Sequence, residues 1–580
     1  MTYWLEKNPS GFFEDYIPSA PYLGIMWDRH EEVSVLIGGR AGEGINKAST
    51  ILAHLLGHLG YRIYMYYDYP SLIRGGHNFA IIRATAEERG THQDAVDFLL
   101  CMNQETQKLH EHRIREGTVV IFDSTTTSGD GIGVPLTTIL KEEQAPEISR
   151  NSGIIGAFCR AAGITWEVVT EVFTRDIPKA AAINLKVARR GYDAAGEGPV
   201  NQIQILDGPV LPAMTGNEAI GAGLVRGGLE TYISYPMTPS SSILHFLAEV
   251  ALEYRLTVIH PENEIAVMLM ALGAVYAGSK TAVGTAGGGF CLMTEGLSMA
   301  GMTELPIVLV VSQRPGPSTG LPTYSSQTDL LFVLNAGQGE FARVIIAPAD
   351  AEEAYLWSAR AVSLAWDYQV PVFLLSDKNL SEGLYSLSID PKEQEASPVS
   401  TPDTASGPYR RYAVTESGVS PLRVVPSKGD VIKVNSYEHD EEGITTEDPQ
   451  VTVMMQQKRL RKEGAIRKGL ELYPTVRVYG DPTASIALVT WGSSTWAVRE
   501  AAATLGCRVI QPVVLWPFPL QEMSAALQGA TRRICIEQNA SGQLEQVMTL
   551  QGFATDGHIR RYDGRPWSID EMKIALSEVL

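Results

Sequence analysis

Three segments near the middle of the chain combine side chains that can do chemistry with residues that stiffen the backbone. The first reads Tyr235-Pro236-Met237-Thr238-Pro239, and its two prolines fix φ on either side of Met237-Thr238. The Thr238 hydroxyl is thereby held on a rigid loop, where it can hydrogen-bond to a bound molecule. Ser240 or Ser241 can cap a following helix, but capping does not explain the spacing of the prolines.

The second segment places a carboxylate at the start of an apolar helix. It reads His260-Pro261-Glu262-Asn263-Glu264 and leads into residues 265–277, which are apolar nearly all round. That pattern predicts a helix buried on all sides. A carboxylate at its mouth is either a partner of the helix dipole or a desolvated acid with a catalytic role. The residues alone leave both interpretations open.

The third segment places Arg314 directly after a strand-like run, on a loop that continues Pro315-Gly316. Its guanidinium suits a two-point contact with a substrate carboxylate. Glycines near the start of the chain also follow a strand-like run, and their backbone N–H groups can bind an anion. These glycines are Gly38, Gly39, Gly42 and Gly44, and a second turn of this kind contains Arg74 and Gly75. A tight turn with an exposed arginine explains the same residues equally well.

Strand-like and helix-like stretches alternate along three parts of the chain, which is typical of α/β sheets. The chemical segments follow predicted strands, and ligands of open α/β sheets gather at the carboxyl ends of strands. The predicted fold class is therefore α/β, with three domains built on parallel or mixed sheets. The predicted boundaries are 30–200, 205–385 and 481–580, with a linker or surface excursion at 386–480. That excursion contains a basic helix at 451–473, which we interpret as a solvated face.

The composition excludes several classes of function. Among 580 residues, 66 are acidic and 47 basic, and the net charge of −19 disfavours non-specific binding to nucleic acid. No apolar run is long enough for a membrane span, and the first residues lack a signal-peptide layout, so we expect a cytoplasmic location. The five cysteines form no CxxC pattern, which predicts reduced, mostly buried thiols and no local iron–sulfur motif.

The motifs together resemble those of the 2-oxoacid:ferredoxin oxidoreductases. YPMTPSS at 235–241 is similar to the YPITPSS signature of their alpha subunit, with a volume-conserving Met237 in place of the commoner Ile. GGRAGEG at 38–44 and YPSLIRGGHNFAIIRA at 69–84 resemble the gamma domain, and IEQNASGQL at 536–544 resembles the transketolase-like C-terminal domain. The order gamma then alpha is that of the two-subunit, 2-oxoglutarate-type members.

The resemblance implies a thiamine diphosphate enzyme with a pyrimidine-type domain at 205–385. Such enzymes interconvert a 2-oxoacid, coenzyme A and oxidised ferredoxin with acyl-CoA, carbon dioxide and reduced ferredoxin. Glu264 falls at the position of the acid that contacts the aminopyrimidine ring, and Glu262 is the fallback. Thr238 and Arg314 match the positions that hold the carbonyl and carboxylate of the 2-oxoacid.

The remaining predicted contacts concern the cofactor loop and coenzyme A. Tyr235 and Pro236 belong to the loop expected to contact thiamine diphosphate. The glycine-rich turns of the gamma-like domain, including Arg74 and Gly75, suit the phosphates of coenzyme A.

The chain lacks the other half of such a site. Gly129-Asp130-Gly131 imitates the start of the diphosphate–magnesium motif of thiamine enzymes, but Asn151-Ser152-Gly153 stands where paired asparagines should close it. We interpret it as a surface loop and expect no metal ligands in this chain. The resemblance thus implies a beta subunit that carries Mg²⁺ and a [4Fe-4S] cluster, in a dimer of alpha–beta heterodimers.

Several alternatives stay open at this point. The substrate can be 2-oxoglutarate, which the subunit layout favours, or pyruvate or a broader range of 2-oxoacids. A non-redox thiamine lyase, an assembly subunit without a site, and a protein that binds only coenzyme A or a nucleotide are further possibilities. The YPMTPSS loop argues against the last, and the joint presence of Glu264, Thr238 and Arg314 argues against a subunit without a site.

Overall fold

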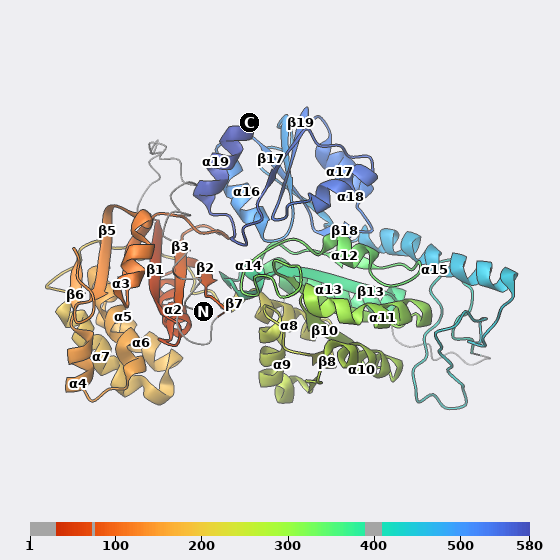
Figure 1. The fold of residues 1–580 in the computed structure, drawn as a ribbon, viewed down its shortest axis with the longest axis horizontal. Helices are drawn as coiled ribbons and strands as arrows, with labels where there is room; N and C mark the ends of the chain where they lie inside the picture. The colour runs from red at the N-terminus through yellow and green to blue at the C-terminus, as the bar shows by residue number, and fades with distance from the viewer. Residues whose placement is uncertain (1–30, 72–75, 389–408) are drawn as a thin grey trace, which may run out of the picture.

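The computed structural model of the chain describes residues 31–71, 76–388 and 409–580. Their strands form three sheets of eight, seven and five strands, which confirms the α/β class with mixed sheets. We call them the first, second and third sheet in chain order. Figure 1 shows the first sheet at one end of the molecule, the second at the other, and the third above them. Among the described helices, none is both long enough and apolar enough to cross a membrane.

The first sheet has the order β6-β5-β4-β1-β3-β2-β14-β7. Strands β1, β4, β5 and β6 run parallel, whereas β3, β2, β14 and β7 add antiparallel neighbours. The predicted doubly buried strand is β1, because Val35 and Ile37 pack in one core and Leu36 in the other. The strands are β1 (Glu32–Arg40), β2 (Arg62–Asp68), β3 (His77–Thr85), β4 (Val96–Cys101), β5 (Ile114–Asp123), β6 (Ile132–Val134), β7 (Ala213–Thr215) and β14 (Leu384–Ser386). The helices of this region are α2 (Ile45–His58), α3 (Gln104–Leu109), α4 (Leu136–Glu142), α5 (Arg150–Ala161), α6 (Trp166–Asp176) and α7 (Ala181–Ala194).

The second sheet has the order β18-β12-β13-β11-β10-β8-β9 and is parallel except for β18. Its strands are β8 (Thr231–Ser234), β9 (Thr257–Ile259), β10 (Thr281–Thr285), β11 (Ile307–Gln313), β12 (Val344–Ile346), β13 (Pro371–Asp377) and β18 (Val514–Trp516). Its helices are α8 (Gly216–Arg226), α9 (Ser241–Tyr254), α10 (Glu264–Tyr276), α11 (Gly287–Thr303), α12 (Leu330–Asn335), α13 (Ala351–Tyr368) and α14 (Lys378–Glu382). The chain runs outward from β8 to β9 and then crosses back to β10 on the other side of β8. That reversal is the point where open α/β sheets bind ligands.

The third sheet has the order β15-β17-β16-β19-β20 and is parallel except for β15. Its strands are β15 (Val476–Tyr479), β16 (Ile486–Thr490), β17 (Arg508–Pro512), β19 (Arg532–Glu537) and β20 (Gly557–Arg560). The helices around it are α16 (Ser494–Ala502), α17 (Leu520–Leu527), α18 (Gln543–Leu550) and α19 (Ile569–Val579). β18 leaves this region and pairs with β12, so the third sheet is attached to the second by main-chain hydrogen bonds.

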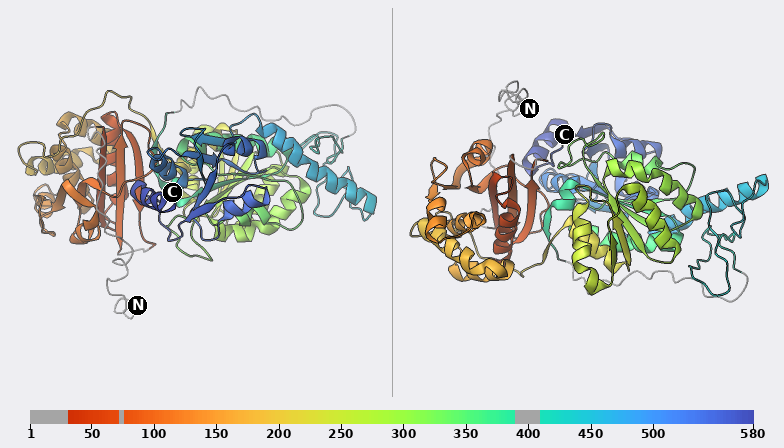
Figure 2. Two further views of the ribbon diagram at one scale, coloured as in Figure 1. Left: turned by 90° about the horizontal axis from the view of Figure 1, so that it is seen from above. Right: turned by 60° about the horizontal axis from the view of Figure 1, so that its bottom comes forward.

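Buried polar contacts join the three parts of the molecule. Arg83 of β3 forms a buried ion pair of 2.7 Å with Glu500 of α16. Lys378, directly after β13, donates to the carbonyl oxygen of Tyr67 in β2. These contacts tie the first sheet to both of the others. The ribbon views of Figure 2 show the first sheet beside the other two parts of the molecule.

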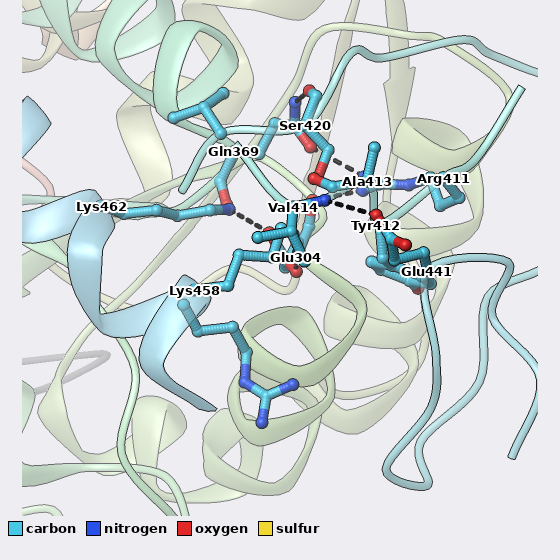
Figure 3. A network of polar contacts seen from close by, with 12 residues as sticks. Glu304, Gln369, Arg411, Tyr412, Ala413, Val414, Ser420, Glu441, Lys458 and Lys462 are labelled. Atoms are coloured by element: carbon cyan, nitrogen blue, oxygen red, sulfur yellow. Dashed lines mark hydrogen bonds and ion pairs between the residues drawn. The ribbon is translucent and has the colours of Figure 1, made fainter. Parts of the chain in front are cut away.

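A buried charge cluster attaches the long helix α15 (Pro449–Leu470) to the second sheet. The predicted solvated face of α15 is wrong, because Lys458 and Lys462 are 0% and 2% exposed. Their ammonium groups lie 2.7 and 2.5 Å from the carboxylate of Glu304 at the end of α11. Arg411 donates to the carbonyl oxygen of Glu304 at 2.7 Å and so anchors the excursion as well (Figure 3).

The cluster is held together by charge. Burial alone would raise the pKa of the Glu304 carboxyl, but Lys462 and Lys458 together hold that pKa well below its usual range. The buried carboxylate of Glu304 pairs with Lys458 and Lys462, so these two lysines of α15 point into the protein. The spacing of polar and apolar residues along the helix cannot predict this.

We expect Glu304→Gln to destabilise the attachment of α15, because two buried ammonium groups lose their counter-ion. Removing one partner of a buried pair costs about 3–5 kcal/mol. The change should appear as faster hydrogen exchange in α15 and residues 409–448, and as a lower midpoint of thermal unfolding. Glu463→Gln removes a more exposed pair with Arg467 on the same helix and should cost about 1 kcal/mol or less. Equal effects of the two substitutions would contradict this account.

Candidate functional site

The candidate site lies where the chain reverses direction in the second sheet. The carboxyl ends of the neighbouring strands β8, β10 and β11 lead into the loop 235–239, the first turn of α11 and Arg314 respectively. α10 follows β9 and begins at Glu264. Because these strands are parallel, Thr238, Glu264 and Arg314 lie at one edge of one sheet. The sequence analysis predicted this edge, since each residue follows a predicted strand.

Glu264 is a buried acid that is not used for capping. The side chain of Asn263 caps α10 by accepting from the N–H of Ala266 at 3.0 Å. Glu264 is only 3% exposed, and its Oε1 is buried without a hydrogen-bond partner among the described residues. A buried carboxyl oxygen without a partner is costly unless it meets another group.

Gly289, in the first turn of α11, makes room for this acid. A Cβ at Gly289 would overlap both Oε1 of Glu264 and Oγ1 of Thr285. The glycine run 287–289 thus lets two helices approach closely enough to confine the carboxyl group between them. The hydroxyl of Thr285 lies 4.0 Å from the sulfur of Met237, so the same contact reaches the loop after β8.

Arg314 is fixed against that loop. Its Nη1 donates to the carbonyl oxygen of Thr238 at 2.7 Å, and its Nε is buried with no partner in the described parts of the chain. Burial lowers the pKa of the guanidinium, and the nearby Asp329 opposes this. Arg314 is half-buried, so its guanidinium is a partly desolvated cation that can receive a carboxylate.

The serines after this loop do not cap α9, contrary to the sequence prediction. Ser240 precedes the helix without a side-chain cap, and its hydroxyl donates instead to the carbonyl oxygen of Met237 at 2.8 Å. The hydroxyl thus stiffens the loop. Tyr235 and Pro236 lie at its start, and the Tyr235 ring meets the ring of His260 edge-on at 5.9 Å between centroids.

One residue of this edge escaped the sequence analysis. Asp329 lies beside Arg314, with its carboxyl oxygens 2.6 and 2.7 Å from the position of a Cβ on Gly287. It follows no strand and belongs to no recognisable motif, so the sequence offers no local signal for it.

The glycine-rich turn belongs to the first sheet and does not join this cluster. Gly38 and Gly39 lie within β1, which ends at Arg40, and do not follow the strand as the sequence predicted. Gly44, with φ of 75°, precedes α2. Gly42 has φ of 96° and open space around the position of its Cβ. The carboxylate of Glu43 accepts from the N–H of Arg40 at 2.6 Å, so the turn already binds an acid of its own.

The second glycine turn cannot be placed. Arg74 and Gly75 lie outside the described residues.

The apolar helix α10 is not buried on all sides, contrary to the sequence prediction. Ile265 and Leu269 are 49% and 44% exposed, and Met270 is similar. Leu292 and Cys291 of α11 are exposed as well. The two helices contact each other, and both carry exposed apolar residues on their outer sides. We call these residues the α10–α11 face. Its residues are Ile265, Leu269, Met270, Cys291 and Leu292.

The loop at 129–131, the possible metal ligands and the cysteines can each be located in the described ranges. Gly129-Asp130-Gly131 is exposed, as expected of a surface loop. Within these ranges, no group of three or more His, Cys, Asp or Glu residues could hold a metal ion. All five cysteines are free, and four of them are buried.

Comparison with known proteins agrees with this geometry. Two family models match: a thiamine diphosphate-binding domain of pyruvate flavodoxin/ferredoxin oxidoreductase over residues 222–458, and a pyruvate ferredoxin/flavodoxin oxidoreductase domain over 34–194. The alpha subunit of a 2-oxoacid:ferredoxin oxidoreductase from Aeropyrum pernix is 29% identical, over 95% of this chain and 98% of that protein. The chain belongs to the 2-oxoacid:ferredoxin oxidoreductases.

The names of two further relatives of this oxidoreductase chain include a substrate. The 2-oxoglutarate synthase subunit KorA of Methanothermobacter thermautotrophicus is 29% identical, over 58% of this chain and 89% of its own. A solved structure of 2-oxoglutarate:ferredoxin oxidoreductase from Magnetococcus marinus, with 2-oxoglutarate, coenzyme A and succinyl-CoA bound, matches with a TM-score of 0.87 and 27% identity. That match covers 94% of this oxidoreductase chain and 99% of the other.

The contact between Gly289 and Glu264 predicts a sharp difference between neighbouring glycines. Gly289→Ala should displace the Glu264 carboxyl and lower turnover of the assembled oxidoreductase by about 100-fold, the cost of a misplacement of about 1 Å at a reacting group. Gly288→Ala is the matched control, because its Cβ meets only the carbonyl oxygen of Ser318, at 3.5 Å. Equal activity of the two variants, measured by dye reduction, would contradict the assignment of Glu264.

Proposed function

We propose that this chain is the gamma-fused alpha subunit of a 2-oxoglutarate:ferredoxin oxidoreductase. The enzyme interconverts 2-oxoglutarate, coenzyme A and oxidised ferredoxin with succinyl-CoA, carbon dioxide and reduced ferredoxin. The observation that carries the proposal is the buried, unpartnered carboxyl of Glu264 at the ligand-binding edge of the thiamine diphosphate-binding domain. The substrate is inferred from the printed names of relatives, with pyruvate as the alternative.

Glu264 is the residue that fits the aminopyrimidine ring of thiamine diphosphate. Bound there, the cofactor supplies the nucleophilic carbon that attacks the 2-oxoacid. The carboxyl of Glu264 is buried and lacks a partner, so it can share a proton with a ring nitrogen without competing water. Gly289 holds that carboxyl in place, and Tyr235 and Pro236 form the start of the loop that faces it.

Arg314 and Thr238 fit the 2-oxoacid itself. The guanidinium of Arg314 has a buried Nε without a described partner, and this donor can hold the C1 carboxylate. Its contact with the carbonyl oxygen of Thr238 fixes the two residues relative to each other. The Thr238 hydroxyl is then available for the ketone oxygen, whose polarity grows during attack.

Coenzyme A is assigned to the first sheet. Gly42 and Gly44 lie in the turn between β1 and α2, and Gly38 and Gly39 lie just before it, near the end of β1. The N–H groups of this turn suit a phosphate. For a phosphate to enter, Glu43 must give up the N–H of Arg40. Arg74 and Gly75, which lie outside the described residues, are assigned to the same phosphates from the sequence alone.

A beta subunit completes the enzyme. We infer that it covers the α10–α11 face and carries the diphosphate–Mg²⁺ motif and the [4Fe-4S] cluster that delivers electrons to ferredoxin. A patch of half-exposed Ile, Leu and Met beside a buried acid is what a permanent interface leaves bare on one partner. We propose a dimer of alpha–beta heterodimers in the cytoplasm, and the free cysteines fit a reducing compartment.

The proposal is tested by purifying the chain from its native host together with its partner. The complex should show iron–sulfur absorbance and reduce a viologen dye with 2-oxoglutarate and coenzyme A, and Glu264→Gln should lower this rate by about 10²–10⁴-fold. Glu262→Gln, two residues earlier, is the control and should retain activity. Full activity from this chain alone would refute the proposal, and preference for pyruvate would correct the substrate.

The interface has a test of its own, because Cys291 is exposed whereas the other four cysteines are buried. A maleimide should label Cys291 in the isolated chain and fail to label it in the complex. Cys291→Ser gives the background signal. Equal labelling in both states would place the partner on another face.

A further inference from the structure

Asp329 is a partly buried acid at the proposed substrate pocket, and no role has yet been given to it. Its carboxyl faces the first turn of α11 at Gly287, and Oδ2 is buried without a partner in the described ranges. Its backbone N–H donates to the side-chain oxygen of Gln313 at 3.0 Å. Because Gln313 directly precedes Arg314, that hydrogen bond fixes Asp329 beside the arginine.

The C-terminal region holds Asp329 in position from the other side. The N–H of Gln327 donates to the carbonyl oxygen of Gln538 at 2.8 Å, and Asn539 donates to the carbonyl oxygen of Gln327 at 3.0 Å. Gln543 donates to the carbonyl oxygen of Thr328 at 2.8 Å and accepts from the N–H of Leu331 at 3.0 Å. The residues on both sides of Asp329 are thus fixed by the segment after β19.

The charges around Asp329 come almost entirely from Arg314. Burial raises the pKa of the Asp329 carboxyl to about 6, against the opposing effect of Arg314. Glu264 contacts the same turn of α11 two residues further on, at Gly289. The C-terminal residues that fix the segment are uncharged amides, and the carboxylate of Glu537 behind them is bound by Trp491 and Asn539.

We propose that Asp329 takes up a proton when the 2-oxoacid carboxylate binds to Arg314, and returns it when that carboxylate leaves as carbon dioxide. This rests on the proposed function of Arg314. In the free site, Asp329 balances the charge of Arg314. An arriving carboxylate adds a second anion to a partly buried site. The energetic cost of two neighbouring anions is removed if Asp329 becomes neutral.

The proton comes from solvent and returns to solvent. In decarboxylation, the bond between the carboxyl carbon and the ketone carbon breaks, and its electron pair stays with the remainder of the substrate. No oxidation or reduction takes place at Asp329. Arg314 then regains Asp329 as its counter-charge.

The sign of the pH dependence follows from this linkage. Bound substrate raises the pKa of Asp329, so binding is accompanied by proton uptake between the free pKa, about 6, and the higher pKa in the complex. The KM for the 2-oxoacid should therefore rise with pH above about 6, by up to about tenfold per pH unit. The kcat should depend less on pH, because the bound state already holds the proton.

The test measures kcat and KM of the complete complex for 2-oxoglutarate between pH 6 and 8, with pyruvate in parallel. Asp329→Asn, a neutral isostere, should retain binding and give a KM that no longer changes with pH in this range. Asp193→Asn on the exposed surface of α7 is the control and should keep the wild-type slope. A wild-type KM that is constant with pH, or an unchanged slope in Asp329→Asn, would overturn the inference.

A second variant keeps the test decisive if Asp329→Asn is inactive. If that variant is inactive at every pH, Asp329→Glu restores the carboxyl: recovered turnover with a sloping KM supports the inference, and no recovery overturns it. A wild-type complex that turns over neither 2-oxoacid would instead refute the proposed function, so the two failures are distinguishable.

Discussion

The confinement of the Glu264 carboxyl against Gly289 is the constraint on which the rest of the site depends. An acid at this depth is tolerated only where a partner will meet it, and neither the cap of α10 nor a described side chain provides that partner. The glycine run at the start of α11 allows the close approach, and the reversal of the second sheet brings the loop after β8 to the same place. The buried Oε1 of Glu264 thus accounts for three features that occur together: the glycine run at the start of α11, the proline-stiffened loop after β8 and the buried start of α10.

Three side chains of the candidate site meet at one edge of the second sheet, beside exposed apolar residues. Glu264, Thr238 and Arg314 converge at one sheet edge, and the α10–α11 face lies bare beside them. The described residues contain no cluster of metal ligands. The first and third sheets lie on either side of this edge in the chain: the first carries the glycine-rich turn, and the segment after β19 of the third fixes the loop that carries Asp329.

The sequence predicted those parts of the fold that local pattern determines. Strands β8, β10 and β11 are short apolar runs that are followed within two residues by Pro236, Gly287 and Arg314. The ends of these strands, and with them Thr238 and Arg314, could therefore be located in advance. The exposed side of α10 could not be foreseen, because an apolar helix looks the same whether protein or a missing partner covers it. The inward lysines of α15 depend on Glu304, more than 150 residues earlier in the chain. Asp329 depends on Gln538, Asn539 and Gln543, which follow it by more than 200 residues.

The central claim is that a buried acid of this chain contacts a cofactor whose diphosphate is held by another polypeptide. A density map of the assembled complex with thiamine diphosphate tests it most directly. The account predicts the aminopyrimidine nitrogen within hydrogen-bond distance of the Glu264 carboxyl, and the diphosphate and Mg²⁺ bound by the beta subunit. A ring bound away from Glu264, or a diphosphate and metal bound wholly by this chain, would contradict it.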